Sequence, residues 1–159
     1  MRVRLDTGLP GSTARQRRVT VPPTLNTFGS PDSPRLGFRE GRVEEAVHEV
    51  ALAQAIWRQV LSEMERQEGR RLLALDLVVG AWSGADPESL EFALGLLIAE
   101  SAWPQARVRI RREPLALVCR ACGREFEAED LNLVCPGCGG LDVDPVRGQQ
   151  LLLESLEVE

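Results

Sequence analysis

The chain has 159 residues, of which 43% are hydrophobic and 27% charged, which suits one medium domain or a small core with a mini-domain attached. No apolar run approaches the roughly 18 residues of a membrane-spanning helix, so we expect no membrane partner. Residues 47–159 carry 11 Arg and 19 acidic residues, a net charge of −8, which argues against sequence-independent binding to nucleic-acid phosphates.

Residues 1–46 differ in composition from the rest of the chain. They contain five of the ten prolines, together with Gly, Ser, Thr and scattered Arg, and no helical or strand periodicity is visible. Such a stretch buries too little apolar surface to offset the entropy lost on ordering. We therefore expect a disordered extension at 1–46. It lacks the apolar segment of a secretory signal, which favours a cytoplasmic protein.

A helix and a strand follow. Apolar residues recur at helical spacing from about Glu44, and Gly69 is a plausible C-terminal stop. The apolar positions are Val50, Ala53, Ile56, Trp57, Val60 and Met64. Residues 71–82 predict a strand with one buried face, formed by Leu73, Leu75, Leu77 and Val79. The opposite face, with Asp76 between Ala74 and Val78, is expected to be half covered.

The next pair of elements is again a helix and a strand. Asp86-Pro87-Glu88 predicts a helix start, because Asp86 can accept the free first-turn amides and Pro87 has no amide to satisfy. We prefer this capping role for Asp86 to a metal-ligand role. Leu90, Leu94, Leu97 and Ile98 give the buried stripe to about Ser101. Residues 107–112 alternate Arg with apolar residues, which predicts a strand with one exposed face. The arginines could suggest nucleic-acid binding, but no aromatic residues are interleaved with them, so we expect a solvated edge.

The four cysteines of the chain form two Cys-x-x-Cys pairs, Cys119/Cys122 and Cys135/Cys138. Each pair is followed by a glycine that can take positive φ and turn amides toward the sulfurs. Four thiolates on two tight turns suit a closed tetrahedral zinc site with a structural role. The alternatives are two disulfides, which need an oxidising compartment, and a dithiol redox site, which usually has a single pair. Zinc is the preferred interpretation.

Strand character returns after the cysteines, at residues 149–158. The spacing from Leu153 to Leu156 breaks the alternation, which predicts a bulge near Glu154 or Ser155. The expected fold is therefore α/β (α+β): a small mixed sheet with two helices, formed by residues 47–113 with 146–159. A four-cysteine zinc ribbon at 114–145 is expected to be inserted into it.

Several short motifs in this order resemble the HypA family of nickel-insertion proteins. They are Val47-His48-Glu49-Val50, Val79-Gly-Ala-Trp-Ser83, Glu88-Ser-Leu90 with Phe92-Ala93, the two Cys pairs, and the tail Leu153-Glu-Ser-Leu-Glu-Val158. The resemblance covers 47–159 and none of 1–46. It implies a nickel metallochaperone, not an enzyme, which helps to insert Ni(II) into [NiFe]-hydrogenase or urease precursors and holds a structural Zn(II).

The resemblance also implies a nickel site and partners. His48 and Glu49 would bind Ni(II) as transient cargo, with Cys119, Cys122, Cys135 and Cys138 as the zinc ligands. The implied partners are a HypB-type GTPase and a hydrogenase large-subunit precursor, with the protein a monomer or weak homodimer and no nucleic acid bound. Some members carry a further His in or near the ribbon, whereas His48 is the only histidine here.

Family members begin with Met-His-Glu, and the Met position here is Val47. Because an internal GTG codon is translated as valine, we hypothesise that translation starts at position 47 and that 1–46 is a mis-assigned extension. A free amine next to His48 would then offer the amine, the His48 amide and the imidazole, with the Glu49 amide completing the square-planar set that Ni(II) favours. For an isolated histidine, a partly exposed helix-start residue would be the simpler interpretation. For Glu49 the simpler role is a charge that complements the helix dipole.

Two other functions remain open from the residues alone. One is a zinc-ribbon adaptor that binds protein or nucleic acid without a nickel role. The other is a dithiol redox enzyme, which zinc retention and unreactive thiols would exclude.

Overall fold

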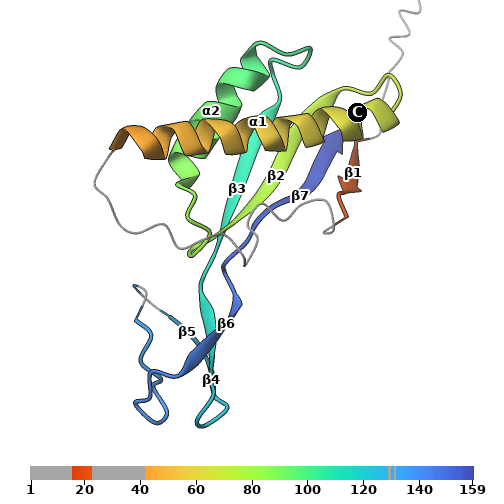
Figure 1. Ribbon diagram of the computed structural model, residues 1–159. Coiled ribbons are helices and arrows are strands. Elements are labelled where there is room, and N and C mark those ends of the chain that lie inside the picture. Colours follow the sequence, from red (N-terminus) through yellow and green to blue (C-terminus); the bar gives the residue numbers. More distant parts are fainter. Residues whose placement is uncertain (1–15, 23–41, 129, 131) are drawn as a thin grey trace, which may run out of the picture.

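The computed structural model describes residues 16–22, 42–128, 130 and 132–159, with the backbone alone for residues 42–48 (Figure 1). In chain order the elements are β1 (Arg17–Thr20), α1 (Arg42–Arg66), β2 (Leu72–Gly80), α2 (Pro87–Ala99), β3 (Arg107–Glu113), β4 (Ala116–Cys119), β5 (Glu125–Glu127), β6 (Val143–Arg147) and β7 (Leu151–Val158). Neither described helix is long and apolar enough to cross a lipid bilayer.

The larger unit is a four-stranded mixed sheet in the order β1-β7-β2-β3. Strand β2 pairs in parallel with β3 and antiparallel with β7. Figure 1 shows both helices packed against this sheet. The core between them contains Ile56 and Val60 of α1, Leu90 and Leu94 of α2, and alternate residues of β2 and β7. This arrangement confirms the expected fold class.

The two long strands differ in how well their faces were predicted. In β7 the register shifts so that Ser155 pairs with Asp76 and Leu153 with Leu77, which leaves Glu154 as the extra residue and confirms the predicted bulge. In β2 a second shift between Leu72 and Ala74 was not predicted. Because one extra residue reverses the faces, Leu72 joins the core at 2% exposure, while Leu73 is only half-buried.

Residues 1–46 differ from the expectation of uniform disorder at one place. Arg17–Thr20 form β1, which pairs antiparallel with β7 from Arg17 opposite Val158 to Thr20 opposite Ser155. The Val21 amide donates to the Glu154 carbonyl at 3.1 Å, and the Val21 side chain is 4% exposed in the core. The segment therefore adds an edge strand to the sheet. The predicted disorder of residues 1–15 and 23–41 lies outside the described residues.

The smaller unit is a three-stranded sheet in the order β5-β4-β6, inserted between β3 and β7 as expected. Figure 1 shows it extending away from the helices. Its last strand continues to Arg147, two residues past the expected end of the ribbon at 145. Its core is small, with Leu115, Leu117 and Ala128 buried.

Two glycines pack where the units meet. The Gly80 amide donates to Gln150 O at 2.8 Å, and the Trp82 amide donates to Gly148 O at 2.7 Å. A Cβ on Gly80 would overlap the Gly148 carbonyl, and one on Gly148, where φ is 88°, would overlap Pro114 and Leu115. Only glycine permits this approach of three backbone segments.

Strand β3 is an edge strand of the larger sheet, as the alternating arginines predicted. Val108 and Ile110 pack on the core, while the arginines between them lie on the face opposite the helices, here called the outer face. Asp76 lies on this outer face at 8% exposure and accepts a hydrogen bond from Ser155 Oγ at 2.7 Å.

Candidate metal centre

The four cysteine sulfurs converge at one end of the smaller sheet. All four Sγ atoms lie within 4.8 Å of one another, and Cys119–Cys138 and Cys122–Cys135 are each 3.6 Å apart. Zn–S bonds of about 2.3 Å in a tetrahedron place sulfurs about 3.8 Å apart, so the cluster fits Zn²⁺ with little rearrangement. All four cysteines are free thiols, which does not support the disulfide alternative. No other group of three or more potential ligands is found among the described residues.

The two Cys-x-x-Cys turns have the same backbone geometry. In each, the amide of the following glycine donates to the carbonyl of the first cysteine at 2.8 Å, from Gly123 to Cys119 and from Gly139 to Cys135. Both glycines have φ of 73°, as the sequence predicted. Because a side chain is strained at that angle, these glycines allow the tight turns that present the sulfur pairs.

Backbone amides make the cluster electrostatically uneven. The Cys138 and Gly137 N–H groups approach the Cys135 sulfur, the latter at 3.4 Å, and they lower the pKa of Cys135 to about 6. The Arg124 N–H lowers the pKa of Cys122, but hydrogen bonding with Cys135 and desolvation outweigh it and raise that pKa to about 11. Cys135 therefore ionises easily, whereas Cys122 resists becoming a second thiolate beside it. A bound cation would stabilise both thiolates together.

An ion pair fixes the first turn to the strand that leaves the ribbon. Arg120 donates from Nε and from an η-nitrogen to the two carboxylate oxygens of Asp144, each at 2.6 Å. Its amide also donates to Asp142 O at 2.9 Å. These contacts hold residues 119–122 against β6, so part of the site's geometry does not depend on metal.

The predicted nickel ligands lie on α1, far along the chain from the cysteines. His48 is within the helix, whose backbone begins upstream of Val47 at Arg42. The His48 side chain is outside the described residues, so its nickel role stays a prediction.

The Glu49 side chain is described, and it is buried at 2% exposure. Its Oε1 accepts a hydrogen bond from the Asp86 amide at 3.3 Å, while Oε2 is buried with no hydrogen-bond partner among the described residues. Glu49, the eighth residue of α1, therefore joins that helix to the start of α2. The simpler role considered for Glu49 is a charge that complements the helix dipole. That role does not account for a carboxylate that is buried and bonded to the Asp86 amide.

Asp86 occupies the capping position that the sequence predicted. Its Oδ2 accepts from the Ser89 amide at 2.8 Å, and this bond lowers the pKa of Asp86. The link from its own amide to Glu49 was not predicted, because the two residues are 37 positions apart and no local pattern connects them.

Comparisons with known proteins identify a family that has this combination of a helix-flanked sheet and a four-cysteine ribbon. Residues 47–158 match the family described as "Hydrogenase/urease nickel incorporation, metallochaperone, hypA". The chain belongs to the HypA family. It is thus a nickel metallochaperone of hydrogenase maturation with a four-cysteine metal site, and HypA proteins carry metal without catalysing a reaction.

Two relatives are similar to this chain in sequence, and one solved structure is similar to it in fold. The chain is 30% identical over 113 residues to the hydrogenase maturation factor HypA of Aquifex aeolicus, covering 71% of this chain and 98% of the relative. It is 33% identical over 114 residues to that of Geobacter metallireducens, covering 71% of this chain and all of the relative. The fold resembles a solution structure of a HypA protein, with a TM-score of 0.54 at 22% identity over 71% of this chain and 97% of that one.

Proposed function

We propose that this HypA protein carries Ni(II) at residues 47–49, with His48 as the side-chain ligand and Glu49 next to it in the chain, and that Zn(II) occupies the four-cysteine cluster. The family match over 47–158 carries the nickel proposal, and the 3.6 Å sulfur spacings carry the zinc proposal. Zinc with four thiolates has no open position, so its contribution is to hold the ribbon's shape.

The chemistry of the nickel site depends on what precedes His48. In a protein that starts at position 47, with Met in place of Val47, the amine, the His48 and Glu49 amides and the imidazole form the square-planar set. In the longer chain the amide nitrogen of position 47 belongs to helical backbone and offers no free amine. We propose the shorter form as the nickel-binding one.

The buried Glu49 carboxylate has a supporting role in this proposal. Its bond to the Asp86 amide anchors this part of α1 to the start of α2, directly after the proposed ligand His48 in the chain. We infer that Glu49 supplies its amide to nickel and uses its side chain to position His48.

Delivery requires partners, and the proposed ones are a HypB-type GTPase and a [NiFe]-hydrogenase large-subunit precursor. The relatives compared above are named hydrogenase maturation factors, which supports hydrogenase over urease as the client. Few exposed nitrogen ligands suit a carrier, because a cargo must be released as well as bound.

The test is a Ni(II) titration by calorimetry of zinc-loaded protein in both forms, one starting at position 47 and one carrying residues 1–46. We expect stoichiometric binding by the short form only, abolished in His48→Ala. Glu49→Gln keeps the amide and the shape of the side chain, so it should weaken nickel binding far less than His48→Ala does.

Each other outcome changes a specific part of the proposal. Equal binding by both forms would move the site away from the free amine. Loss of binding in Glu49→Gln would make the carboxylate a ligand. If neither form binds nickel, the carrier site at His48 is wrong and a zinc-ribbon adaptor becomes the better description.

A further inference from the structure

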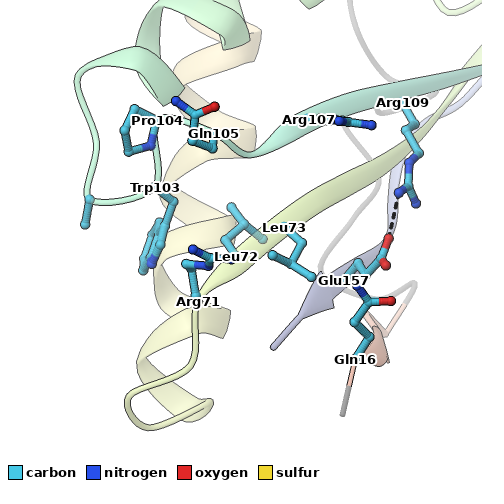
Figure 2. A pocket seen from close by; sticks show the side chains of 11 residues that line it. Gln16, Arg71, Leu72, Leu73, Trp103, Pro104, Gln105, Arg107, Arg109 and Glu157 are labelled. Carbon is cyan, nitrogen blue, oxygen red and sulfur yellow. Dashed lines mark ion pairs between the residues drawn. The ribbon is translucent and has the colours of Figure 1, made fainter. Parts of the chain in front are cut away.

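A cleft lies along the larger sheet near β1, from Arg109 on the outer face to Trp103 beside the core. It consists of two adjoining cavities of about 430 and 410 Å³, which share Gln16, Arg109 and Glu157 in their walls. Figure 2 shows the first of them, with Trp103 and Leu73 toward one end and Arg107 and Arg109 toward the other. None of these residues belongs to either metal site.

Arginines outnumber carboxylates in the walls of this cleft, on a protein that is otherwise acidic. The arginines that line it are Arg17, Arg18, Arg71, Arg107 and Arg109, from β1, the α1–β2 connection and β3. Glu157 is the one acidic residue among the described residues that line it. Because the chain carries a net charge of −5, this concentration of arginine is opposite in sign to the overall charge.

Part of the positive charge is compensated within the sheet, and part is not. Arg109 pairs with Glu157 at 2.7 Å and with Asp76 at 3.5 Å, and Arg18 pairs with Asp76 at 3.4 Å. Arg17 and Arg107 are exposed and make no ion pair with any described residue. Arg71, which also lines the cleft, pairs with Glu159 at 2.8 Å. Arg17 and Arg107 are therefore the lining arginines available to an anionic ligand.

The other end of the cleft is apolar and ordered. The Trp103 ring packs edge-to-face on Trp57 with centroids 6.5 Å apart, and the Trp103 amide donates a hydrogen bond to Ser101 Oγ at 3.0 Å. The half-buried Leu73, displaced from the core by the β2 bulge, lines the same cavity. An apolar side chain can pack here at little cost, because the wall is already ordered.

One wall of the cleft is not part of the family's matched region. Gln16, Arg17 and Arg18 precede position 47, where the match begins, and the relatives align over 113 to 114 residues that span 95 to 100% of their own lengths. The β1 contribution therefore adds two arginines that the matched region does not supply. The cleft is complete only in the chain that carries residues 1–46, and the shorter form proposed for nickel binding would lack this wall.

We propose that this cleft is a docking site for an extended acidic segment of a partner protein. Its carboxylates pair with Arg17 and Arg107 toward one end of the cleft, and an apolar side chain of the same segment packs on Trp103 and Leu73 toward the other end. Charge complementarity favours an acidic ligand, and the single aromatic wall does not provide the successive stacking platforms that single-stranded nucleic acid uses. The site is separate from nickel and zinc binding.

The experiment uses the zinc-loaded full chain and a fluorescein-labelled synthetic peptide of alternating Glu and Leu, followed by fluorescence anisotropy at low salt. The double variant Arg17→Gln/Arg107→Gln removes the two arginines without ion pairs, and it should weaken binding about tenfold. The matched control is Arg58→Gln/Arg112→Gln, which changes net charge equally at exposed positions outside the cleft. It should bind as the unchanged protein does.

Three results would overturn the proposal. Equal weakening by the control variant would show that only net charge matters. Undiminished binding of the peptide with Gln in place of Glu would remove the role of carboxylates. Tripolyphosphate binding that depends on Arg17 and Arg107, without peptide binding, would make the cleft a phosphate site. Zinc content and circular dichroism of each variant confirm that it is folded.

Discussion

Gly80 and Gly148 show how single residues set the relation between the two units. Each lacks a Cβ where one would overlap another backbone segment, and their region carries the Trp82–Gly148 and Gly80–Gln150 hydrogen bonds. A side chain at either position must push the ribbon's connections away from β2. Since backbone cannot rotate aside as a long side chain can, the strain is not relieved locally.

We expect Gly80→Ala to lower the free energy of unfolding by about 1–3 kcal/mol through overpacking. Gly95→Ala is the matched control, because a Cβ there meets no atom within 4 Å and alanine favours the α2 helix by up to about 1 kcal/mol. Urea unfolding of both variants checks this. If Gly80→Ala were as stable as Gly95→Ala, the close approach at the junction would not exist in solution.

Residues whose role is local were predictable, and those whose role depends on distant contacts were not. The Cys-x-x-Cys-Gly pattern contains both the sulfur geometry and the positive φ of Gly123 and Gly139. The Asp86 cap follows from its neighbours Pro87 and Glu88 in the same way. The burial of Glu49 against the Asp86 amide depends on how two helices meet, which spacing along one helix does not encode.

Among the elements of the larger sheet, β1 is the one that the sequence did not reveal. It has four residues, three of them exposed, and its surroundings are rich in proline and arginine. An edge strand of this kind has no periodicity of its own, and it forms because β7 offers unpaired backbone groups. Val19 and Val21, two positions apart, are the apolar side chains of the described segment 16–22 that contact the core.

Val21→Ala measures whether β1 is part of the cooperative structure. Val21 is 4% exposed, so losing two methyl groups should lower the free energy of unfolding by about 1–2 kcal/mol. Thr20→Ala, at an exposed position of the same strand, should change it by less than about 0.5 kcal/mol. Denaturant unfolding of the full chain gives both values, and identical stabilities for the two variants would mean that β1 is not docked.

The longer elements were predictable because their patterns are long. Both helices, the edge strand β3 and the Glu154 bulge follow from periodicity, since seven or more residues with one buried face leave little choice. The β2 bulge escaped because Leu72 and Leu73 are both leucine, so the composition is the same in either register. Only pairing with β7 decides which of the two faces the core.

At the scale of the whole molecule, the two units differ in what stabilises them. The helix-flanked sheet has a continuous apolar core, whereas the described part of the ribbon buries only Leu115, Leu117 and Ala128 in its own cluster. So small a core does not offset the entropy of ordering the ribbon, and the metal must supply the difference.

The zinc affinity of the ribbon should fall as the pH falls. The pKa of about 11 keeps Cys122 protonated at neutral pH, so zinc must displace at least that proton. Each unit of decrease in pH should therefore weaken zinc binding at least about tenfold. The dependence should steepen below about pH 6, where Cys135 also binds a proton in the metal-free protein. Competition with a chelating dye at several pH values measures this, and a constant affinity near neutrality would contradict it.

The place of the ribbon in the chain affects the order in which the protein can fold. Strand β7 pairs with β2 only after residues 114–150 have closed a loop that begins at the end of β3. Closing a flexible loop of that length costs about 3 kcal/mol of chain entropy. A folded ribbon shortens that loop, because the pairing of β4 with β6 already brings the two ends of the loop together. At those ends, the Glu113 carbonyl accepts from the Ala81 amide, and the Gln150 carbonyl accepts from the Gly80 amide. Zinc binding should thus speed up the pairing of β7 with β2, which is the long-range step in folding. The sheet of the larger unit would then be completed after the ribbon has bound zinc.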